Sequence, residues 1–510
     1  METHLFLLFI LSFLLMAITS YCLFYNHQSN HSPPTYAFIS FFNNRHRLLS
    51  WYTHLLSQSP SQTVLIRRLT PPKTILTANP QNVEYILKTN FINFPKGKPF
   101  TDVLQDFLGT GIFNVDGDLW LTQRKLASHQ FTSRSLKQHV KTTIVQAVKT
   151  KLFPLLDSLA ASDTAVDFQE VLRRLGFDIV CKLSLGFDPC CLGDQHSFSH
   201  QVPILKAFDT AAAIVAKRAA TPISAVWKLK KFLGIGSEKV LKDSVLEIHA
   251  YITEIVDERK KIIINSEENE LDLLSRMIMG GVNEELIRDM VISFIMAGRD
   301  TTSAAMTWLF YMLSRHTHVE EKLVSELAFQ FKDDECENLK EMKYLQACLC
   351  ESMRLYPPVS WDSKHAVDDD MLPDGTPVSA GDRVTYFPYG MGRMEKLWGV
   401  DRLEFRPNRW FDGEADEMGR MLVLKEVSAY KYPVFHAGPR VCLGKGMANV
   451  QMSYVVASIV KRFEIRAVGS EEAVYLPLLT AHMEGGFKVW IRRRRPTIGA
   501  TCRHEYNLRK

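Results

Sequence analysis

The sequence lacks the features that identify a repeat protein, a disulfide-rich secreted domain or a nucleic-acid-binding protein. Its 510 residues contain no internal repeat, no collagen-like period and no low-complexity tract, and the charged fraction of 23% is ordinary for a globular chain. The nine cysteines are odd in number and irregularly spaced, so they do not predict a disulfide framework. The formal net charge of +5 is too small and dispersed to indicate nucleic-acid binding. These absences favour a large globular protein in a reducing compartment.

The cysteine pattern also gives little support to a zinc site. Cys190 and Cys191 are adjacent, and Cys348 and Cys350 alternate with one other residue. Neither pair has a second C-x-x-C or a histidine pair at ligand spacing. We interpret all four as small, buried, apolar side chains.

The N-terminus carries a long apolar run, from residue 5 to residue 24. Roughly 20 residues at about 1.5 Å each span a hydrocarbon layer of about 30 Å. A cleaved signal peptide is the alternative, but it would begin with basic residues, whereas the first four residues contain Glu2 and no Lys or Arg. Arg45 and Arg47 follow the run, so the positive-inside rule places the next domain in the cytosol. We therefore expect a membrane anchor over 1–26 and a polar, proline-containing linker over 27–45.

The remaining sequence predicts a mainly α-helical fold with a minor β part. β-branched runs at 63–69 and 73–77, separated by Pro71 and Pro72, indicate a hairpin. The segment 284–315 has no proline and apolar residues on every face, so it predicts a helix through the core. Length alone would allow about three domains. The motifs favour a single catalytic domain over 46–497, followed by a tail over 498–510.

The loop from Phe435 to Gly444, FHAGPRVCLG, places Cys442 where it could ligate a metal. Gly438 and Gly444 permit tight turns close to a flat cofactor, and Arg440 adds a fixed positive charge suited to a carboxylate. The residues that follow have helical spacing, so we expect a helix that begins at Cys442. Its amide dipoles would then point at the sulfur and favour the thiolate. The alternative is a structural cysteine buried in a loop.

A polar island of Arg299, Asp300, Thr301 and Thr302 interrupts the apolar helix predicted over 284–315. Burying an unpaired charge is costly, so the island requires either partners or a function. A satisfied internal ion pair or a local water site is the alternative to a catalytic role.

Glu351 and Arg354 stand at i and i+3 in CLCESMRLYPP. They share one helical face and can form a charge-assisted pair. Pro357 and Pro358 end this helix. Taken alone, such a pair normally lies on a solvated surface.

These segments resemble the haem-thiolate monooxygenases, the cytochromes P450, whose signature is F-x-x-G-x-R-x-C-x-G. Phe435, Gly438, Arg440, Cys442 and Gly444 match its fixed positions. The resemblance implies the cytochrome P450 fold with haem b. Cys442 would be the iron ligand, Arg440 would meet a propionate, and Phe435 would pack near the sulfur. Thiolate donation in this family favours oxygen–oxygen cleavage.

The polar island resembles the family's A-G-x-D/E-T-T motif, which matches residues 297–302. By this resemblance Asp300 relays protons, and Thr301 supplies a hydroxyl on the oxygen side of the haem. Gly298 would leave room for dioxygen.

The pair Glu351 and Arg354 resembles the family's E-x-x-R motif. Arg409, in FRPNRW, stands at the position of the family's later arginine. The implied role of these three residues is to brace the haem loop.

Two further positions resemble contacts to the haem propionates. Trp120 and Arg124 are similar to the family's W-x-x-x-R pair. Lys364 stands where the family often has a propionate-binding arginine, although lysine cannot make the bidentate contact.

Four longer strings resemble the plant clan that hydroxylates the terminal carbon of fatty acids, and within it the subfamily that oxidises jasmonoyl-isoleucine. They are YILKTNFINFPKGKPFTD (85–102), AGRDTTSAAMTWLF (297–310), RLYPPVSWDSKHA (354–366) and VTYFPYGMGRMEKLWG (384–399). Two departures from the family stand out. Residues 33–44 are shorter than the usual start of the catalytic domain, and Gly446 stands where relatives commonly have Glu.

Terminal hydroxylation requires a pocket that presents only the methyl end of the substrate. By the resemblance, the candidate pocket residues are Phe100, Thr101, Leu104, Phe107, Met296, Ala297, Val359, Trp361, Leu478, Leu479 and Thr480. Core packing is the alternative for each apolar member.

The resemblance implies a single-pass protein of the endoplasmic reticulum membrane with a cytosolic catalytic domain. It would use dioxygen and electrons from NADPH–cytochrome P450 reductase, docked through Lys125, Lys431 and Lys445. The substrate would be a small amphipathic lipid-like molecule: jasmonoyl-isoleucine first, with a long-chain fatty acid or the C-26 position of a sterol side chain as alternatives. A hydroperoxide isomerase and a haem sensor are the other candidate classes, and neither needs the pair of Asp300 and Thr301.

Overall fold

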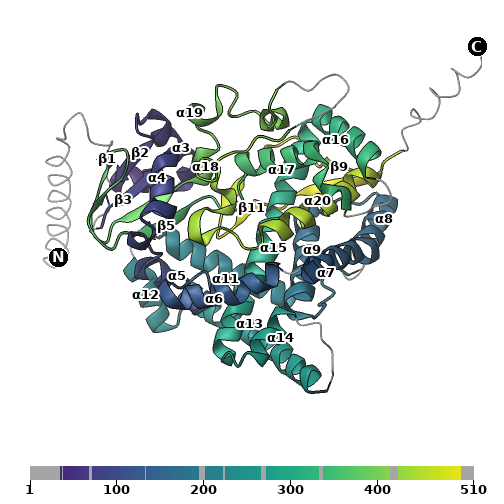
Figure 1. Cartoon of the computed structure of the whole chain (residues 1–510), viewed down its shortest axis with the longest axis horizontal. Coiled ribbons are helices and arrows are strands. Elements are labelled where there is room, and N and C mark those ends of the chain that lie inside the picture. Colours follow the sequence, from purple (N-terminus) through teal and green to yellow (C-terminus); the bar gives the residue numbers. More distant parts are fainter. Residues whose placement is uncertain are drawn as a thin grey trace, which may run out of the picture. The chain divides into compact units, whose positions relative to one another are not determined.

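A computed structural model describes most of the chain (Figure 1). The described residues are 35–36, 38–67, 72–132, 134–193, 202–221, 224–265, 272–331, 337–413 and 423–495. The predicted anchor over 1–26, the first part of the predicted linker and the predicted tail over 498–510 lie outside them. Among the helices that are described, none has the length and apolar character needed to cross a bilayer.

The fold is mainly helical with a minor β part, as predicted, and the chain forms two compact units. Of the described residues, those up to 102 form the first unit together with 360–404 and 427–441, and the second unit comprises those within 103–359, within 405–426 and from 442 onward. Residues 35–36 and 38–43 already form a strand and a helix, although the sequence places them in the linker. The single catalytic domain over 46–497 stays a prediction.

The first unit contains the larger sheet and short helices. Its elements are β1 (Thr35–Tyr36), α2 (Phe38–Asn43), η1 (Arg45–Arg47), α3 (Leu48–Gln58), β2 (Thr63–Ile66), β3 (Thr74–Thr77), α4 (Pro80–Glu84), η2 (Tyr85–Thr89), η3 (Phe91–Asn93), the start of α5 (Lys98–Leu108), β5 (Asp362–His365), β6 (Asp370–Met371), β7 (Pro377–Val378), β8 (Arg383–Tyr386), α18 (Pro388–Met391), α19 (Glu395–Trp398), η7 (Pro433–Phe435) and η8 (Gly438–Arg440).

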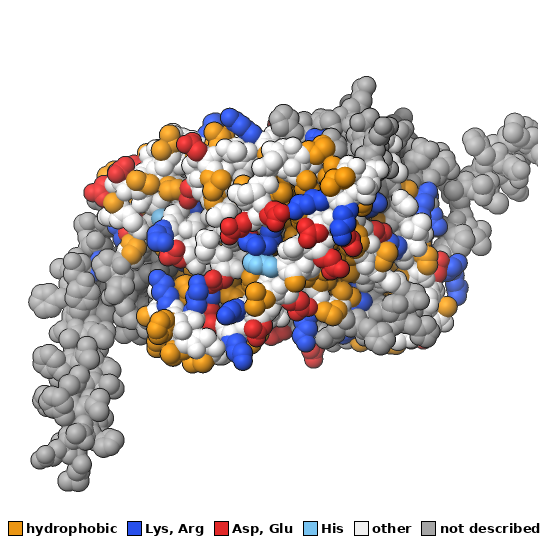
Figure 2. Space-filling view, turned by 90° about the horizontal axis from the view of Figure 1, so that it is seen from below, with side chains coloured by type: hydrophobic (Ala, Val, Ile, Leu, Met, Phe, Trp, Pro, Cys, Tyr) orange, Lys and Arg blue, Asp and Glu red, His pale blue; other side chains and the backbone are white. Residues whose placement is uncertain are grey.

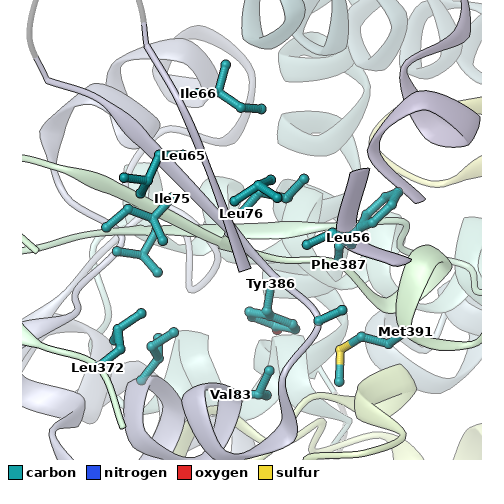
Figure 3. Packing of buried hydrophobic residues seen from close by; sticks show 14 of the residues in the cluster. Leu56, Leu65, Ile66, Ile75, Leu76, Val83, Leu372, Tyr386, Phe387 and Met391 are labelled. Atoms are coloured by element: carbon teal, nitrogen blue, oxygen red, sulfur yellow. The ribbon is translucent and has the colours of Figure 1, made fainter. Parts of the chain in front are cut away.

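The sheet of the first unit has the order β1-β2-β3-β8-β5. The predicted hairpin is confirmed, because β2 and β3 pair antiparallel with Thr63 opposite Thr77. Strand β8 then joins β3 in parallel, so residues far apart in sequence share one sheet. Leu65, Leu76 and Phe387 belong to the apolar core on this sheet, which Figure 3 shows from close by.

The second unit contains the long helices. Its elements are the rest of α5, α6 (Gly117–Thr132), α7 (Arg134–Ala147), η4 (Val148–Leu152), α8 (Phe153–Ser162), β4 (Val166–Asp167), α9 (Phe168–Leu185), α11 (Pro203–Ala220), α12 (Ser224–Leu233), α13 (Ser237–Asn265), α14 (Leu273–Met279), α15 (Glu284–Arg315), α16 (Thr317–Gln330), η5 (Glu337–Lys340), α17 (Lys343–Leu355), η6 (Pro407–Trp410), α20 (Lys445–Arg462), β9 (Phe463–Ala467), β10 (Tyr475–Pro477), β11 (Ala481–Met483) and β12 (Lys488–Arg493).

Helix α15 has the bounds that the sequence predicts, and most of its residues are buried. Asn283 caps it by accepting a hydrogen bond from the amide of Leu286 at 2.7 Å. In Figure 1 it runs beside α9 and α17, which pack against it. It is therefore the central helix of the second unit.

Gly298 lets α9 and α15 approach closely. A Cβ atom at this position would lie 2.5 Å from Cγ2 of Val180, which is too short for any contact. The space that the missing side chain leaves is thus filled by Val180 of α9. Close packing of the two helices is thus one requirement for this glycine, and room for dioxygen stays a prediction.

The described cysteines are not disulfide-bonded. Cys191 and Cys348 are buried, as predicted, but Cys190 is exposed and Cys350 is only half-buried, so the prediction is wrong for Cys190 and holds only in part for Cys350. A turn separates the neighbours: Cys190 has a φ of +52°, and the amide of Cys191 donates to the buried Asp178 at 2.7 Å. Because the backbone turns between them, adjacent cysteines experience different surroundings.

The surface carries both signs of charge. Figure 2 shows Lys and Arg side chains interspersed with Asp and Glu side chains on one face of the molecule. This mixture agrees with the small net charge of +5.

Candidate functional site

The fully buried carboxylate of Glu351 is the centre of a hydrogen-bonded cluster in the second unit. Arg354, one helical turn further along α17, donates from Nε to Oε2 and from Nη2 to Oε1, both at 2.8 Å. Arg409 on η6 donates from Nε to Oε1 at 3.0 Å, and the amide of Arg406 donates to the same oxygen at 3.0 Å. Trp410 completes the set by donating from Nε1 to Oε2 at 2.9 Å. The three residues predicted to act together thus meet at one carboxylate, and α17 is tied to the segment around η6.

Cys442 lies just before helix α20. The helix begins at Lys445 with Gly444 at its N-cap, so the expectation of a helix starting at Cys442 is wrong by three residues. The glycine-containing loop simply extends further than the helical spacing suggests. The amides of Gly444 and Lys445 nevertheless donate to the sulfur, as expected for a thiol beside a helix N-terminus.

Two opposing influences act on the Cys442 thiol. Desolvation by the surrounding protein is the larger influence and raises its pKa above the ordinary value. The amides of Gly444 and Lys445 and the charge of Arg124 act in the opposite direction. The thiolate is therefore favoured by its hydrogen-bond donors, but these donors alone do not outweigh desolvation, and a cation bound to the sulfur would add the missing stabilisation.

Trp120 and Arg124 lie on α6, in the same unit as Cys442. The Arg124 guanidinium lies 5.6 Å from the centroid of the Trp120 ring, so the two side chains stack at one turn of the helix. Burial lowers the pKa of Arg124, and the charge of Cys442 opposes this shift. The Arg124 guanidinium, which stacks on Trp120, is thus a cation close enough to Cys442 to act on its thiol.

Residues 297–301 of α15, which include part of the polar island, lie on two faces of the helix that differ in burial. Ala297 and Thr301 are half-buried, whereas Gly298, Arg299 and Asp300 are buried. The hydroxyl of Thr301 donates to the carbonyl of Ala297 at 2.6 Å, which fixes the side chain along the partly open face. Arg299 Nε lies 3.3 Å from Asp300 Oδ1, so an internal ion pair is present within the island.

The candidate pocket residues of the second unit come from several elements. Leu104 and Phe107 are buried on α5, and Met296 is buried on α15. Residues 478–480 lie in the turn between β10 and β11, and the amide of Ala481 pins that turn by donating to the carbonyl of Pro358 at 2.8 Å. Val359, next to it, is 38% exposed. Phe100, Thr101 and Trp361 belong to the first unit and are half-buried there.

In the first unit, Gly438 has a structural requirement of its own. Its φ is +64°, and a Cβ atom would lie 1.9 Å from the carbonyl oxygen of Leu87 in η2. Only glycine satisfies both conditions. Phe435 on η7 and Arg440 on η8 flank this glycine and are half-buried.

Lys364 is buried in the first unit beside a carboxylate. Its ammonium lies 2.8 Å from Asp362 Oδ2, the Tyr386 hydroxyl donates to the same oxygen at 3.2 Å, and His436 Nε2 lies 3.3 Å from it. Burial raises the pKa of Asp362, but Lys364, Lys96 and His436 outweigh it and hold the pKa well below the ordinary value. Asp362 therefore remains ionised and fixes the lysine that stands in place of the family's arginine.

Sequence reasoning missed several side chains of these clusters, namely Trp410, Asp362, Tyr386 and His436. Trp410 directly follows Arg409, and Asp362 lies two residues before Lys364, so each stands beside a motif residue. His436 gives a weaker signal, because it occupies a variable position of the cysteine loop and has an unusual φ of +61°.

The chain's donors fit a haem. Among the described residues, no group of three or more His, Cys, Asp or Glu side chains could hold a metal, so Cys442 would act as a lone protein ligand. A thiolate that accepts amide hydrogen bonds suits iron in a haem. Arg124, Arg440 and Lys364 are cations suited to propionate groups.

Comparison with known proteins identifies the family. The sequence profile described as Cytochrome P450 matches residues 31–478. Cytochrome P450 94B1 of Arabidopsis thaliana is 57% identical over 465 residues, which cover 89% of each chain. Cytochrome P450 94B3 of the same organism is 55% identical over 507 residues, 95% of this chain and 98% of the relative. Cytochrome P450 94A2 of Vicia sativa is 44% identical over 466 residues, 90% of each chain.

The family requires haem iron held by a thiolate and electrons that NADPH supplies through a reductase. The match spans both compact units and nearly the whole described chain. The chain belongs to the cytochrome P450 family and is a haem-thiolate monooxygenase.

Proposed function

We propose that this monooxygenase hydroxylates the terminal carbon of the pentenyl side chain of jasmonoyl-isoleucine. The observation that carries the proposal is the pattern of similarity: 57% and 55% identity to the two 94B relatives against 44% to the 94A relative. The strings RLYPPVSWDSKHA and GMGRMEKLWG point the same way, since they resemble the subfamily that oxidises this conjugate. A long-chain fatty acid and the C-26 position of a sterol side chain are the alternative substrates.

Cys442 is the proposed iron ligand, and its support is the amide donors and the nearby Arg124 described above. Arg440, Lys364, Trp120 and Arg124 would hold the propionates. When bound, the haem supplies oxygen activation. Glu351, Arg354 and Arg409 would keep the structure around the cofactor rigid without taking part in the chemistry.

Asp300 and Thr301 are the proposed proton-delivery residues. Thr301 lies on the less buried face of α15 and keeps its hydroxyl oriented through Ala297, while Asp300 is ion-paired on the buried side. The hydroxyl would hold a proton on the oxygen side of the site, and the carboxylate would resupply it. A hydroperoxide isomerase or a sensor has no use for such a pair, which favours the monooxygenase.

A pocket for terminal hydroxylation would hold the amide and carboxylate of the conjugate away from the cofactor. Phe100, Thr101, Leu104, Phe107, Met296, Ala297, Val359, Trp361 and residues 478–480 are its proposed lining. A buried donor left unpaired costs about 1–3 kcal/mol, so a fatty acid that lacks the amide should be a poorer substrate.

We further propose that the chain is anchored in the endoplasmic reticulum membrane by residues 1–26, with the catalytic part in the cytosol. The apolar run over residues 5–24 supports this arrangement, which also gives a lipid-like substrate access from the bilayer.

The experiment that tests the substrate is a competition assay. Microsomes containing this protein and a plant reductase would receive jasmonoyl-isoleucine, lauric acid and a hydroxylated sterol together with NADPH. Products identified by mass spectrometry give the ratio of specificity constants and show whether oxidation continues to aldehyde or acid. A preference for lauric acid or the sterol would remove the jasmonate proposal and leave the haem chemistry intact.

The iron ligand is tested by Cys442→Ala, with Cys190→Ala as the matched control because Cys190 is the other exposed cysteine among the described residues. We expect Cys442→Ala to abolish the thiolate-type absorption of the reduced carbon monoxide complex and Cys190→Ala to retain it. A thiolate spectrum from Cys442→Ala would contradict the assignment.

A further inference from the structure

Helix α15 carries a buried arginine that links two acidic residues. The Arg299 side chain is 1% exposed. Its Nη2 lies 2.5 Å from Asp209 Oδ1 on α11, and its Nε lies 3.3 Å from Asp300 Oδ1 on α15. Arg173 on α9 binds the same oxygen of Asp209. A continuous line of charges thus runs from Asp209 through Arg299 to Asp300, entirely within the second unit.

Asp209 is the end of this line that reaches solvent, since its side chain is 38% exposed while that of Asp300 is 3% exposed. Burial raises the pKa of Asp209, but the charges of Arg299 and Arg173 outweigh it and lower the pKa below its ordinary value. Asp209 is therefore ionised at neutral pH. It can accept hydrogen bonds from solvent while it holds the arginine.

The inner part of the line is incompletely hydrogen-bonded. Among the described residues, Nη1 of Arg299 is buried and has no hydrogen-bond partner, whereas Nε of Arg299 and Oδ1 of Asp300 lie 3.3 Å apart as an ion pair without a well-aligned hydrogen bond. Buried polar atoms are normally satisfied by protein or by ordered water. Nη1 belongs to the guanidinium that bridges Asp209 and Asp300, so it is the donor that can offer a hydrogen bond to water between the two carboxylates.

Other charged groups surround the line without replacing any member of it. Arg174 and Glu170 on α9 pair with each other at 2.8 Å, and Glu170 also lies 3.4 Å from Arg173. His482 on β11 lies close enough to Arg173, Asp300 and Asp209 for their charges to affect its pKa. Burial and Arg173 lower the pKa of His482, so the imidazole is neutral at physiological pH and leaves the charges of the line unchanged.

We propose that Asp209 is a positioning residue for proton supply to Asp300. Through Arg299 it fixes the orientation of the Asp300 carboxylate, and it forms the solvent end of the route by which that carboxylate is reprotonated. The inference rests on the proposed role of Asp300 and Thr301.

The proton balance follows from the monooxygenase reaction. One atom of dioxygen enters the substrate and the other leaves as water, with electrons supplied by NADPH and protons supplied by solvent. A proton reaching Asp300 by way of water near Asp209 passes to the Thr301 hydroxyl, and Asp300 returns to its ionised, Arg299-paired state. If supply is slow, reduced oxygen escapes as hydrogen peroxide, and NADPH is consumed without product.

The test measures product and hydrogen peroxide per NADPH in Asp209→Asn, in water and in D2O. We expect haem content and the reduced carbon monoxide spectrum to match the wild type, and the product yield per NADPH to fall about 3- to 10-fold, with a larger solvent isotope effect. Asp157→Asn is the matched control, because Asp157 is 40% exposed and pairs with Arg493 at 2.9 Å. Asp209→Glu should restore the yield.

Equal coupling and equal isotope effects in Asp209→Asn and Asp157→Asn would overturn the proposal. If Asp209→Asn loses haem, the experiment uses Arg299→Lys instead, because lysine keeps the charge but cannot reach both carboxylates. Unchanged coupling in Arg299→Lys would also overturn the proposal.

The outcome is separable from the proposed function. The product yield per NADPH is measured with whichever substrate, jasmonoyl-isoleucine or lauric acid, the enzyme turns over. The result therefore does not depend on the substrate assignment. Asp300→Asn tests the underlying role by itself, and Asp209→Asn added to it should lower coupling no further if both act on one route.

Discussion

Glu351 and Asp300 are both buried carboxylates of the second unit, yet their surroundings differ in one respect. Glu351 accepts hydrogen bonds from Arg354, Arg409, Trp410 and the amide of Arg406. Asp300 has an ion-pair partner in Arg299, and its Oδ1, which lies 3.3 Å from Nε of that arginine, accepts no well-aligned hydrogen bond among the described residues.

The contrast separates a structural carboxylate from one that can exchange a proton. A carboxylate surrounded by donors is held in one position, because moving it would break several charge-assisted hydrogen bonds at once. A carboxylate held by one ion pair without well-aligned hydrogen bonds has fewer such bonds to break when it reorients. Both are buried acids beside arginine, so burial and charge pairing alone do not distinguish them.

The largest effect is expected from Glu351→Gln, which replaces a charged acceptor by an amide among five donors. Leaving buried arginines without their charged partner costs about 3–5 kcal/mol, so we expect loss of folded, haem-containing protein. Thermal unfolding and haem content measure it. Glu464→Gln is the control, since Glu464 forms only partly exposed ion pairs with Arg466 and Arg494. Equal stability of the two variants would show that the Glu351 cluster does not support the fold.

Asp300→Asn should slow product formation and leave the fold intact, in contrast to Glu351→Gln. The variant keeps the size of the side chain and removes the exchangeable proton, so we expect normal folding and haem content with product formation slowed about 10- to 100-fold. Steady-state product formation at saturating reductase measures the change. Destabilisation comparable to that of Glu351→Gln would place Asp300 among the structural carboxylates.

Thr301→Ala should lower the product yield per NADPH more than it lowers the rate of NADPH consumption. The variant retains haem and consumes NADPH, but without the hydroxyl a larger share of the electrons ends in hydrogen peroxide, about 3- to 10-fold more per product. Thr302→Ala is the matched control, because Thr302 makes the same kind of bond to the carbonyl of Gly298 at 2.7 Å and faces Gln451. Peroxide yields that do not differ between the two variants would count against the role of Thr301.

The smallest effect concerns charges that are exposed to solvent. Lys125→Glu with Lys445→Glu should slow reduction by the reductase a few-fold at low salt, and the difference should shrink as salt rises, since exposed charges are screened beyond about 10 Å at roughly 0.1 M. Stopped-flow reduction at several salt concentrations measures it. Lys431 is left unchanged because its ammonium lies 4.6 Å from the Trp398 ring centroid. Lys239→Glu with Lys242→Glu, both exposed on α13, is the control; the same slowing in that pair would refute the docking lysines.

The periodicity of apolar residues predicted the elements whose sequence pattern is continuous. Helix α15 has an uninterrupted apolar pattern, and the hairpin of β2 and β3 has β-branched runs on either side of prolines, so both are recognisable from sequence. The start of α20 is predicted three residues early, because helical spacing continues into a loop whose glycines carry no periodic signal.

The site was predictable only where residues belong to a motif. Glu351, Arg354 and Arg409 could be named from sequence, and the structure brings their side chains together. Asp209 and Asp362 could not, because each acts through a partner whose position depends on the packing of other elements. The prediction for Cys190 was wrong because it treated adjacent cysteines alike, whereas the backbone turns between the exposed thiol of Cys190 and the buried thiol of the next residue.

Gly438 also bears on the order of events during synthesis. It lies against the backbone of Leu87, and the first unit is assembled from three stretches of chain that end at residue 441. Contacts between such distant positions form late, because closing a long loop costs entropy before the contact is gained. A nascent chain therefore cannot complete the cysteine loop until residues 427–441 have left the ribosome. Haem insertion must then follow translation of nearly the whole protein, and a truncated product would be unable to retain the cofactor.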